Sequence, residues 1–229
     1  MTNGSIDSFD AILFDLDGTL VDTAPDMVAV LLGMQEDHGL DLVSYDLARS
    51  HVSHGAIALV RLAFPDADDD LVKKLHKDYL DRYEEAVCVD SVLYPDIANL
   101  LDSLDAADHP WGIVTNKPTR MTEPLLLTLG LRTRTGCLVC GDTLPQRKPD
   151  PEPLLHASRQ IGVPSNRAIY VGDSLRDIEA GRAAGMGTIA ASYGYITDDD
   201  DPAAWQADLV VSDPRELTHY LLKGVTLSR

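Results

Sequence analysis

Short apolar runs alternate with longer segments of helical periodicity along most of this chain. Six of the short runs are β-rich and are bounded by turn-forming residues, a pattern typical of buried strands. These runs cover residues 11–15, 111–115, 137–140, 168–172, 188–191 and 209–212. Because helical patterns separate strands of this kind, the sequence predicts a doubly wound α/β fold, in which helices cover both faces of a parallel sheet.

Two of the intervening segments predict helices with defined ends. Residues 118–129 lead to Gly130 and residues 174–184 lead to Gly185, and glycine is a common residue just past a helix C-terminus. The side chains expected to face inward are Met121, Leu125 and Leu129 in the first helix, and Leu175, Ile178 and Ala183 in the second.

The region from about residue 24 to residue 94 has helical periodicity without clear strands. Its apolar positions are Met27, Val30, Leu31 and Met34, followed by Leu71, Leu75, Tyr79 and Tyr83. We interpret it as a helical insertion after the first strand that covers the carboxyl edge of the sheet. The expected division is a core domain of residues 1–22 and 95–229 and an α-helical cap domain of residues 23–94.

The chain has 229 residues, of which 37 are acidic and 19 are Lys or Arg, giving a net charge of −18. This charge disfavours nucleic acid and anionic membranes as partners. It also repels anionic substrates, so any phosphate site has to be locally positive. The apolar run 27–34 is too short to span a bilayer, and the N-terminal residues lack the features of a secretory signal. We therefore expect a cytoplasmic protein.

Cys137 and Cys140 have the Cys-x-x-Cys spacing of some redox and zinc sites. They lie, however, within an expected buried strand, where residues three apart face opposite sides. We interpret both as small buried hydrophobic residues.

Two carboxylates, Asp15 and Asp17, follow the first strand directly. Side chains two residues apart on an extended chain point to the same side, so both can aim at one place. Gly18 then allows a sharp turn. Two close carboxylates repel each other, and a divalent cation removes that conflict and attracts a phosphate.

Three further polar clusters lie at strand ends or before a helix: residues 115–117, 148–151 and 172–177. Ligands of doubly wound sheets bind outside the carboxyl ends of the strands. We therefore expect all four clusters to meet, although 158 positions separate Asp15 from Asp173.

Together these clusters resemble the four ordered motifs of the haloacid dehalogenase superfamily. The matching residues are Asp15, Asp17, Gly18 and Thr19, then Thr115 and Asn116, then Lys148, and finally Gly172, Asp173, Ser174 and Asp177. One such motif alone is a weak signal, but the ordered set on the expected strands is specific. The resemblance implies a Rossmann-like core with an inserted helical cap.

The resemblance also implies a catalytic mechanism for phosphate chemistry. Asp15 would be the nucleophile that forms an aspartyl-phosphate, and Asp17 would be the general acid and base. Mg²⁺ would be bound by Asp15, by the backbone carbonyl of Asp17 and by Asp173. Lys148 would stabilise negative charge and keep the Asp15 carboxylate ionised.

The remaining motif residues would hold the substrate or orient these groups. Thr115 and the amide of Asn116 would bind phosphoryl oxygens. Asp177 would orient metal-bound water or the motif lysine, although it could also be an exposed partner on its helix. Ser174 has two interpretations, a site role and a helix cap.

Residues 49–56 are the expected substrate-contacting part of the cap. Ser53 and His54 would donate hydrogen bonds to substrate and Gly55 would allow close approach, although Ser53 could instead cap a helix. Asp22 and Thr23 are interpreted as caps of the first cap helix. Arg120 and Arg176 either add positive potential at the mouth of the site or only pair with acidic residues.

Within the superfamily, Asp17 disfavours the haloacid dehalogenases proper, which lack that residue. The chain is more similar to the phosphoglycolate phosphatase group, and stretches such as 111–118, 176–182 and 193–196 resemble bacterial N-acetylmuramic acid 6-phosphate phosphatases. The expected partner is a small phosphate monoester, and the sequence leaves monomer or homodimer open. Alternatives are a sugar phosphomutase, a signalling receiver that is phosphorylated on aspartate, and an inactive relative.

Overall fold

The computed structural model describes residues 9–224, and the N-terminal segment considered above for a secretory signal lies outside this range. All six predicted strands are present in one sheet, and every neighbouring pair is parallel. Their order is β5 (Leu138–Val139), β4 (Trp111–Val114), β1 (Ala11–Phe14), β6 (Ala168–Gly172), β7 (Gly187–Ala191) and β8 (Leu209–Val211). The predicted doubly wound fold is thereby confirmed.

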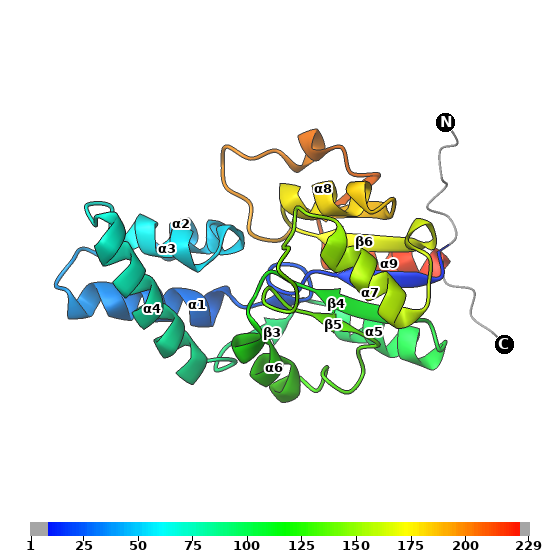
Figure 1. The fold of residues 1–229 in the computed structure, drawn as a ribbon, viewed down its shortest axis with the longest axis horizontal. Helices are drawn as coiled ribbons and strands as arrows, with labels where there is room; N and C mark the ends of the chain where they lie inside the picture. Colours follow the sequence, from blue (N-terminus) through cyan, green and yellow to red (C-terminus); the bar gives the residue numbers. More distant parts are fainter. Residues whose placement is uncertain (1–8, 225–229) are drawn as a thin grey trace.

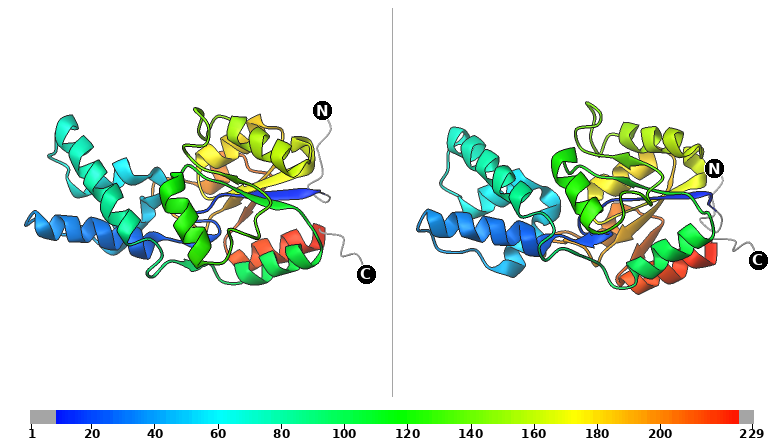
Figure 2. Two further views of the ribbon diagram at one scale, coloured as in Figure 1. Left: turned by 60° about the horizontal axis from the view of Figure 1, so that its bottom comes forward. Right: turned by 90° about the horizontal axis from the view of Figure 1, so that it is seen from below.

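Helices cover both faces of this sheet (Figure 2). Ile12 and Phe14 of β1 pack in one apolar cluster with α5 (Ile97–Ala106) and α9 (Pro214–Gly224). Ala11 and Leu13 face the other way and pack with α7 (Glu152–Ile161) and α8 (Leu175–Ala183). The central strand is therefore buried on both faces, which is why its sequence is continuously apolar.

A helical segment (residues 24–85) lies beyond the carboxyl ends of the strands (Figure 1). It consists of α1 (Ala24–Asp37), α2 (Tyr45–Ser50), the short 3₁₀ helix Val52–His54, α3 (Ala56–Ala63) and α4 (Asp69–Glu85). These helices share an apolar cluster of their own, which Met121 and Tyr195 join from the sheet region. No helix of residues 9–224 is long and apolar enough to cross a membrane.

Two short strands join the helical segment to the sheet region. β2 (Val21–Asp22) and β3 (Val92–Leu93) pair antiparallel on either side of the segment. The expectation of no strand up to residue 94 is therefore wrong at β3. Two-residue strands carry too little sequence pattern to be recognised before their partner is known.

Two predicted helices are present, but one has a different inward face. In α6 (Thr119–Thr128), Met121 and Leu125 are buried as predicted. In α8 only Ile178 of the three expected residues is buried, whereas Leu175 is 43 % exposed and Ala183 is exposed. The inner stripe of α8 instead contains Asp177, Ile178, Gly181 and Ala184, at the i, i+1, i+4 and i+7 positions of one helix face.

The apolar periodicity of the helical segment also needs two corrections. Leu71 is 44 % exposed, and Val72 is buried in its place. Val30 is only partly buried, whereas Val28 is buried. The shifts are of one and two positions, within the width of an amphipathic stripe.

Candidate active site

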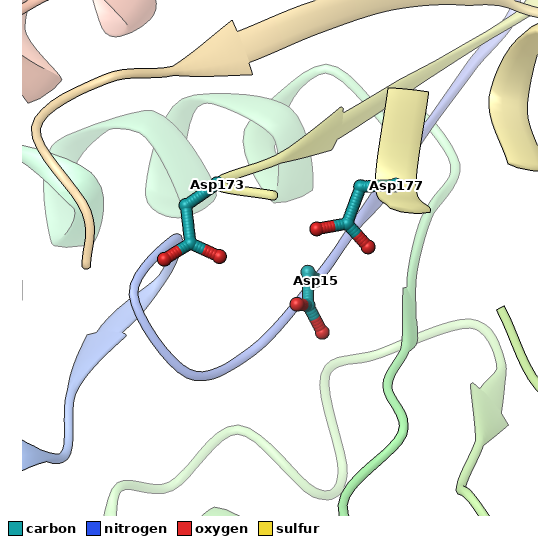
Figure 3. Close-up of side chains that lie close together, drawn as sticks. All are labelled: Asp15, Asp173 and Asp177. Carbon is teal, nitrogen blue, oxygen red and sulfur yellow. The ribbon is translucent and has the colours of Figure 1, made fainter. Parts of the chain in front are cut away.

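Three carboxylates meet where β1 and β6 end (Figure 3). Asp15 follows β1, Asp173 follows β6, and Asp177 lies in the first turn of α8. All three are buried, and one oxygen of each lies within 4.8 Å of the others. The strands are neighbours in the sheet, so residues far apart in sequence leave it side by side.

One ammonium group lies against this cluster. Nζ of Lys148 is 2.9 Å from the Asp15 carboxylate and 2.7 Å from that of Asp177. Tyr170, a buried residue of β6 that the sequence analysis did not single out, accepts a further hydrogen bond from Nζ. Its own hydroxyl donates to the carbonyl of Val114, which fixes it between two strands.

The charges of the cluster are not balanced by Lys148 alone. Burial raises the pKa of Asp15, and Lys148 opposes that rise without cancelling it. Burial, then the charges of Asp15 and Asp177, raise the pKa of Asp173 to about 8. Burial also acts to raise the pKa of Asp177, but Lys148 and Arg176 outweigh it and lower that pKa. Lys148 thus acts on Asp15 in the expected direction, but burial has the larger effect on its pKa.

The Asp15–Asp173–Asp177 cluster fits a divalent cation. Oδ1 of Asp173 is buried and has no hydrogen-bond partner among the described residues, although buried polar atoms are almost always paired. Three carboxylates face one ammonium, so two further positive charges would neutralise them. Carboxylate oxygens are also the donors that hard divalent cations prefer.

The second oxygen of Asp173 is held firmly in place. Oδ2 accepts hydrogen bonds from the Ser53 hydroxyl (2.7 Å) and from the backbone N–H of Tyr195 (2.9 Å). Gly18 and Gly194 leave room for it, because a Cβ on either would come within 1.9 or 2.5 Å of Oδ2. These contacts orient the carboxylate while its other oxygen stays free.

The side chain of Asp17 lies outside the carboxylate cluster and has two partners. Its Oδ1 accepts hydrogen bonds from Thr23 (2.6 Å) and from Lys117 (2.8 Å). Lys117 is buried, donates to the hydroxyl of Tyr83 on α4 (2.8 Å), and lies 4.5 Å from the centre of that ring. The sequence placed Lys117 in the 115–117 cluster but gave no sign of its bond to Asp17.

Asp22 and Thr23 do not cap α1 as expected. The Thr23 hydroxyl is bound to the Asp17 side chain, and the first helical N–H groups have another acceptor. That acceptor is the hydroxyl of Tyr195, which takes hydrogen bonds from the N–H groups of Thr23 (2.7 Å) and Ala24 (2.9 Å) and donates to Asp22 (2.8 Å). A residue 171 positions away performs the capping, which local sequence patterns cannot reveal.

Thr115 and Asn116 lie at the end of β4 as predicted, but with different partners. Thr115 is buried, and its hydroxyl accepts from the N–H of Lys117. The amide of Asn116 donates to the carbonyl of Lys148 (3.0 Å) and accepts from its N–H (3.1 Å). Both polar atoms of the Asn116 side chain therefore bond to the backbone of Lys148 and hold it in position. The sequence had predicted a bond from this amide to a phosphoryl oxygen.

Ser174 and Asp177 interact with each other at the start of α8. The backbone N–H and the hydroxyl of Ser174 both donate to Oδ2 of Asp177. Asp177 is completely buried, which rules out its alternative interpretation as an exposed helix partner. Ser174 is therefore the N-cap residue of α8 and also contacts a member of the carboxylate cluster.

Residues 53–55 form a turn over the cluster. Ser53 is buried and bonded to Asp173, so its side chain does not cap a helix. Gly55 has a φ of +87°, a conformation that favours glycine. Arg176 donates to the carbonyl of Ser53. Arg120 instead pairs with Asp81 and Glu84 at the surface, which is the second of its two expected roles.

A cavity of about 390 Å³ lies between this turn and the ends of the strands. Asp15, Asp17, Thr115 and Asn116 line it from the sheet side. The helical segment contributes an apolar wall and polar groups, namely Met27, Val52, Ser53, His54, Gly55, Ile57, His76, Tyr79, Leu80 and Tyr83. Arg147 and Arg176 add positive charge. The carboxylate that follows β1 therefore faces a space large enough for a metabolite.

Residues 12–191 match the model of the haloacid dehalogenase-like hydrolase family. The chain belongs to this family. It is 48 % identical over 212 residues to the N-acetylmuramic acid 6-phosphate phosphatase of Pseudomonas aeruginosa, covering 92 % of this chain and 94 % of that protein. It is 44 % identical over 207 residues to a phosphoglycolate phosphatase of Xanthomonas campestris, covering 90 % and 94 %.

A solved structure has the same fold. The crystal structure of a predicted phosphoglycolate phosphatase from Haemophilus somnus matches with a TM-score of 0.83 and 29 % identity, covering 93 % of this chain and 98 % of that one. The family and the activity shared by these relatives make the protein an enzyme, a phosphoric monoester hydrolase. The expected superfamily membership is confirmed.

Proposed function

We propose that this hydrolase cleaves the phosphate from a small metabolite through an aspartyl-phosphate on Asp15. The single observation that carries this proposal is the position of Asp15, at the end of the central strand, lining the cavity and 2.9 Å from the ammonium of Lys148. An ionised carboxylate there can attack phosphorus, and the adjacent cation stabilises the charge that develops.

The proposed cofactor is Mg²⁺. Asp15 and Asp173 would hold it through side chains and Asp17 through its backbone carbonyl, with Asp177 close by. When bound, Mg²⁺ supplies positive charge that keeps the carboxylates ionised and attracts the phosphoryl oxygens. The free, buried oxygen of Asp173 and the excess of carboxylates over ammonium groups support this assignment.

The other site residues have proposed roles in proton transfer and positioning. Asp17 would protonate the leaving oxygen and later take a proton from water; it lines the cavity, and Thr23 and Lys117 bond to its Oδ1. Thr115 would hold a phosphoryl oxygen, and Asn116 would keep Lys148 in place through its backbone. Ser174 orients Asp177, which in turn orients Lys148.

We infer that the preferred substrate is N-acetylmuramic acid 6-phosphate, in the recycling of peptidoglycan, with 2-phosphoglycolate as the alternative. The identity of 48 % to the Pseudomonas enzyme favours the first. The cavity volume of about 390 Å³ also favours it, because a two-carbon acid would leave most of the space and the apolar wall without a contact. Residues 23–94 would act as a cap domain that excludes water, and the enzyme would work in the cytoplasm.

Comparing substrates directly tests this proposal. We would measure kcat/KM for N-acetylmuramic acid 6-phosphate, 2-phosphoglycolate and glucose 6-phosphate with Mg²⁺, and repeat each assay with EDTA. The amino sugar phosphate should have the highest value, and EDTA should abolish all three activities. A higher value for 2-phosphoglycolate would support the alternative, and full activity in EDTA would exclude the metal-dependent mechanism. Release of inorganic phosphate separates a phosphatase from a phosphomutase.

A further inference from the structure

Arg176 lines the cavity with a guanidinium group that is only partly used. Its Nη2 donates to the carbonyl of Ser53, but its Nε is buried and has no hydrogen-bond partner. The lysines of the site are different, because Lys117 is paired with Asp17 and Lys148 with two carboxylates. Within residues 9–224, no carboxylate lies at ion-pair distance from Arg176.

A buried hydrogen-bond donor without an acceptor destabilises a protein. The guanidinium group presents its N–H donors as a planar fork that fits the two oxygens of a carboxylate. Arg176 lines the cavity whereas Asp173 and Asp177 do not, and because its side chain as a whole is only partly buried, guanidinium atoms other than the buried Nε can meet a ligand there. Arg147 also lines the cavity but is exposed to solvent.

Arg176 lies near enough to Asp15 and Asp177 for its charge to oppose a rise in their pKa values, but its hydrogen bond is made to the helical segment. The phosphoryl site needs Asp15 together with Thr115 and Lys148, which belong to the sheet region. Arg176 is instead tied to the turn formed by residues 53–55, beside His54 and near the apolar wall of the helical segment. A group on the remainder of the substrate, beyond the phosphate, would lie against this turn.

We propose that Arg176 determines specificity by binding a carboxylate on the leaving group of the substrate. This inference rests on the proposed phosphatase function. It predicts that the enzyme prefers acidic phosphomonoesters to neutral ones of the same skeleton, and that this preference depends on Arg176.

Two matched pairs of substrates test it. One pair is N-acetylmuramic acid 6-phosphate and N-acetylglucosamine 6-phosphate, which lacks only the lactyl ether that carries the carboxylate. The other is 2-phosphoglycolate and 2-hydroxyethyl phosphate. kcat/KM would be measured for the wild type, for Arg176→Gln and for Arg182→Gln. Arg182 is a suitable control because it lies on the same helix, is exposed and contacts Gln206 outside the cavity.

We expect the wild type to prefer the acidic member of at least the amino sugar pair. Arg176→Gln should lower kcat/KM for that acidic member on the order of 10- to 100-fold, mainly through KM, because a hydrogen-bonded charge pair is lost. The neutral member should change by less than about threefold in the same variant. Arg182→Gln should behave as the wild type with every substrate.

Other outcomes would overturn the inference in recognisable ways. An equal loss for acidic and neutral members in Arg176→Gln would mean that Arg176 acts on the phosphate or on the fold. A similar loss of kcat/KM in Arg182→Gln would mean that the effect comes from the change in net charge and not from a contact with the substrate. A wild type without preference would also overturn it while leaving the phosphatase function intact. If the wild type hydrolysed neither member of either pair, the proposed substrates themselves would be wrong.

Discussion

The hydroxyl group of Ser53 donates a hydrogen bond of 2.7 Å to Oδ2 of Asp173, although 120 positions separate the two residues in the chain. The bond joins the helical segment to the carboxylate cluster at the end of the sheet. It also leaves Oδ1 as the oxygen of Asp173 that is free to bind a metal. The position of the helical segment and the orientation of a proposed metal ligand are therefore linked.

Replacing Ser53 by alanine should weaken Mg²⁺ binding. Groups that orient a metal ligand typically contribute about 10- to 100-fold to metal affinity, and Asp173 would keep only its bond from the backbone of Tyr195. The Mg²⁺ dependence of the melting temperature measures the change. Ser50→Ala is the control, since the Ser50 hydroxyl contacts only the local carbonyl of Leu47 and the ring of His51. Equal Mg²⁺ affinity in both variants would contradict the link.

Asp15→Asn should abolish phosphate release without unfolding the protein. Loss of a nucleophile typically lowers kcat on the order of 10⁴-fold or more. Burial and the charge of Asp177 already raise the pKa of Asp15, so an uncharged amide relieves repulsion in the metal-free enzyme. Its melting temperature in EDTA should therefore equal or exceed that of the wild type. Near-normal release of phosphate would refute a nucleophilic role for Asp15.

The metal-free enzyme should lose stability as the pH rises from about 4 to about 8. The pKa of Asp173 is about 8 in the folded state and close to its ordinary 3.8 in the unfolded state, so the folded state binds the additional proton in this interval. Stability falls through this interval because the unfolded state releases its proton while the folded state keeps it, and the fall ends when the buried carboxyl ionises near pH 8. Melting temperatures in EDTA at about pH 5.5 and about pH 8 measure the loss.

Two comparisons assign this pH dependence to Asp173. Asp173→Asn should reduce the fall in melting temperature, because an amide does not titrate in this range. Mg²⁺ should stabilise the wild type more at the higher pH, since it binds the ionised form; at 100 times its dissociation constant the gain is about 2.7 kcal/mol. An identical fall in the variant would assign the effect to other groups.

Lys117→Met should destabilise the protein by about 2–4 kcal/mol. Removing one partner of a fully buried ion pair costs about 3–5 kcal/mol, and the side chain of Asp17 is 17 % exposed, which lowers the figure. Urea unfolding measures the change in the free energy of unfolding. Tyr83→Phe is the control, because it removes only the hydroxyl that accepts from Lys117, at a cost of about 1 kcal/mol.

A double variant separates the ion pair from packing. Asp17→Asn combined with Lys117→Met leaves no unpaired charge, so part of the lost stability should return. If the double variant loses the sum of the two single effects, Lys117 stabilises the protein through its stem and the ring of Tyr83 rather than through Asp17.

The sequence alone predicted the six strands of the sheet and the residues that meet at its carboxyl edge. Asp15 and Asp173 directly follow strongly apolar strands, and parallel strands bring their carboxyl ends together whatever the loops contain. Lys148 precedes a helix and was recognised from the ordered set of motifs. The pattern also identified the helical insertion, because 3.6-residue periodicity persists over four helices. These features follow from local periodicity and from the topology that it implies.

Only the tertiary structure revealed the partners of the site residues. Tyr195 caps α1, Lys117 bonds to Asp17, and Asn116 holds the backbone of Lys148, all through contacts between distant segments. Asp177 is buried because its side of α8 packs against the sheet. The sequence pattern predicted a different buried side of this helix, which included the exposed Leu175. Hydrogen bonds and pKa values depend on distance and burial, which a sequence specifies only through the complete fold.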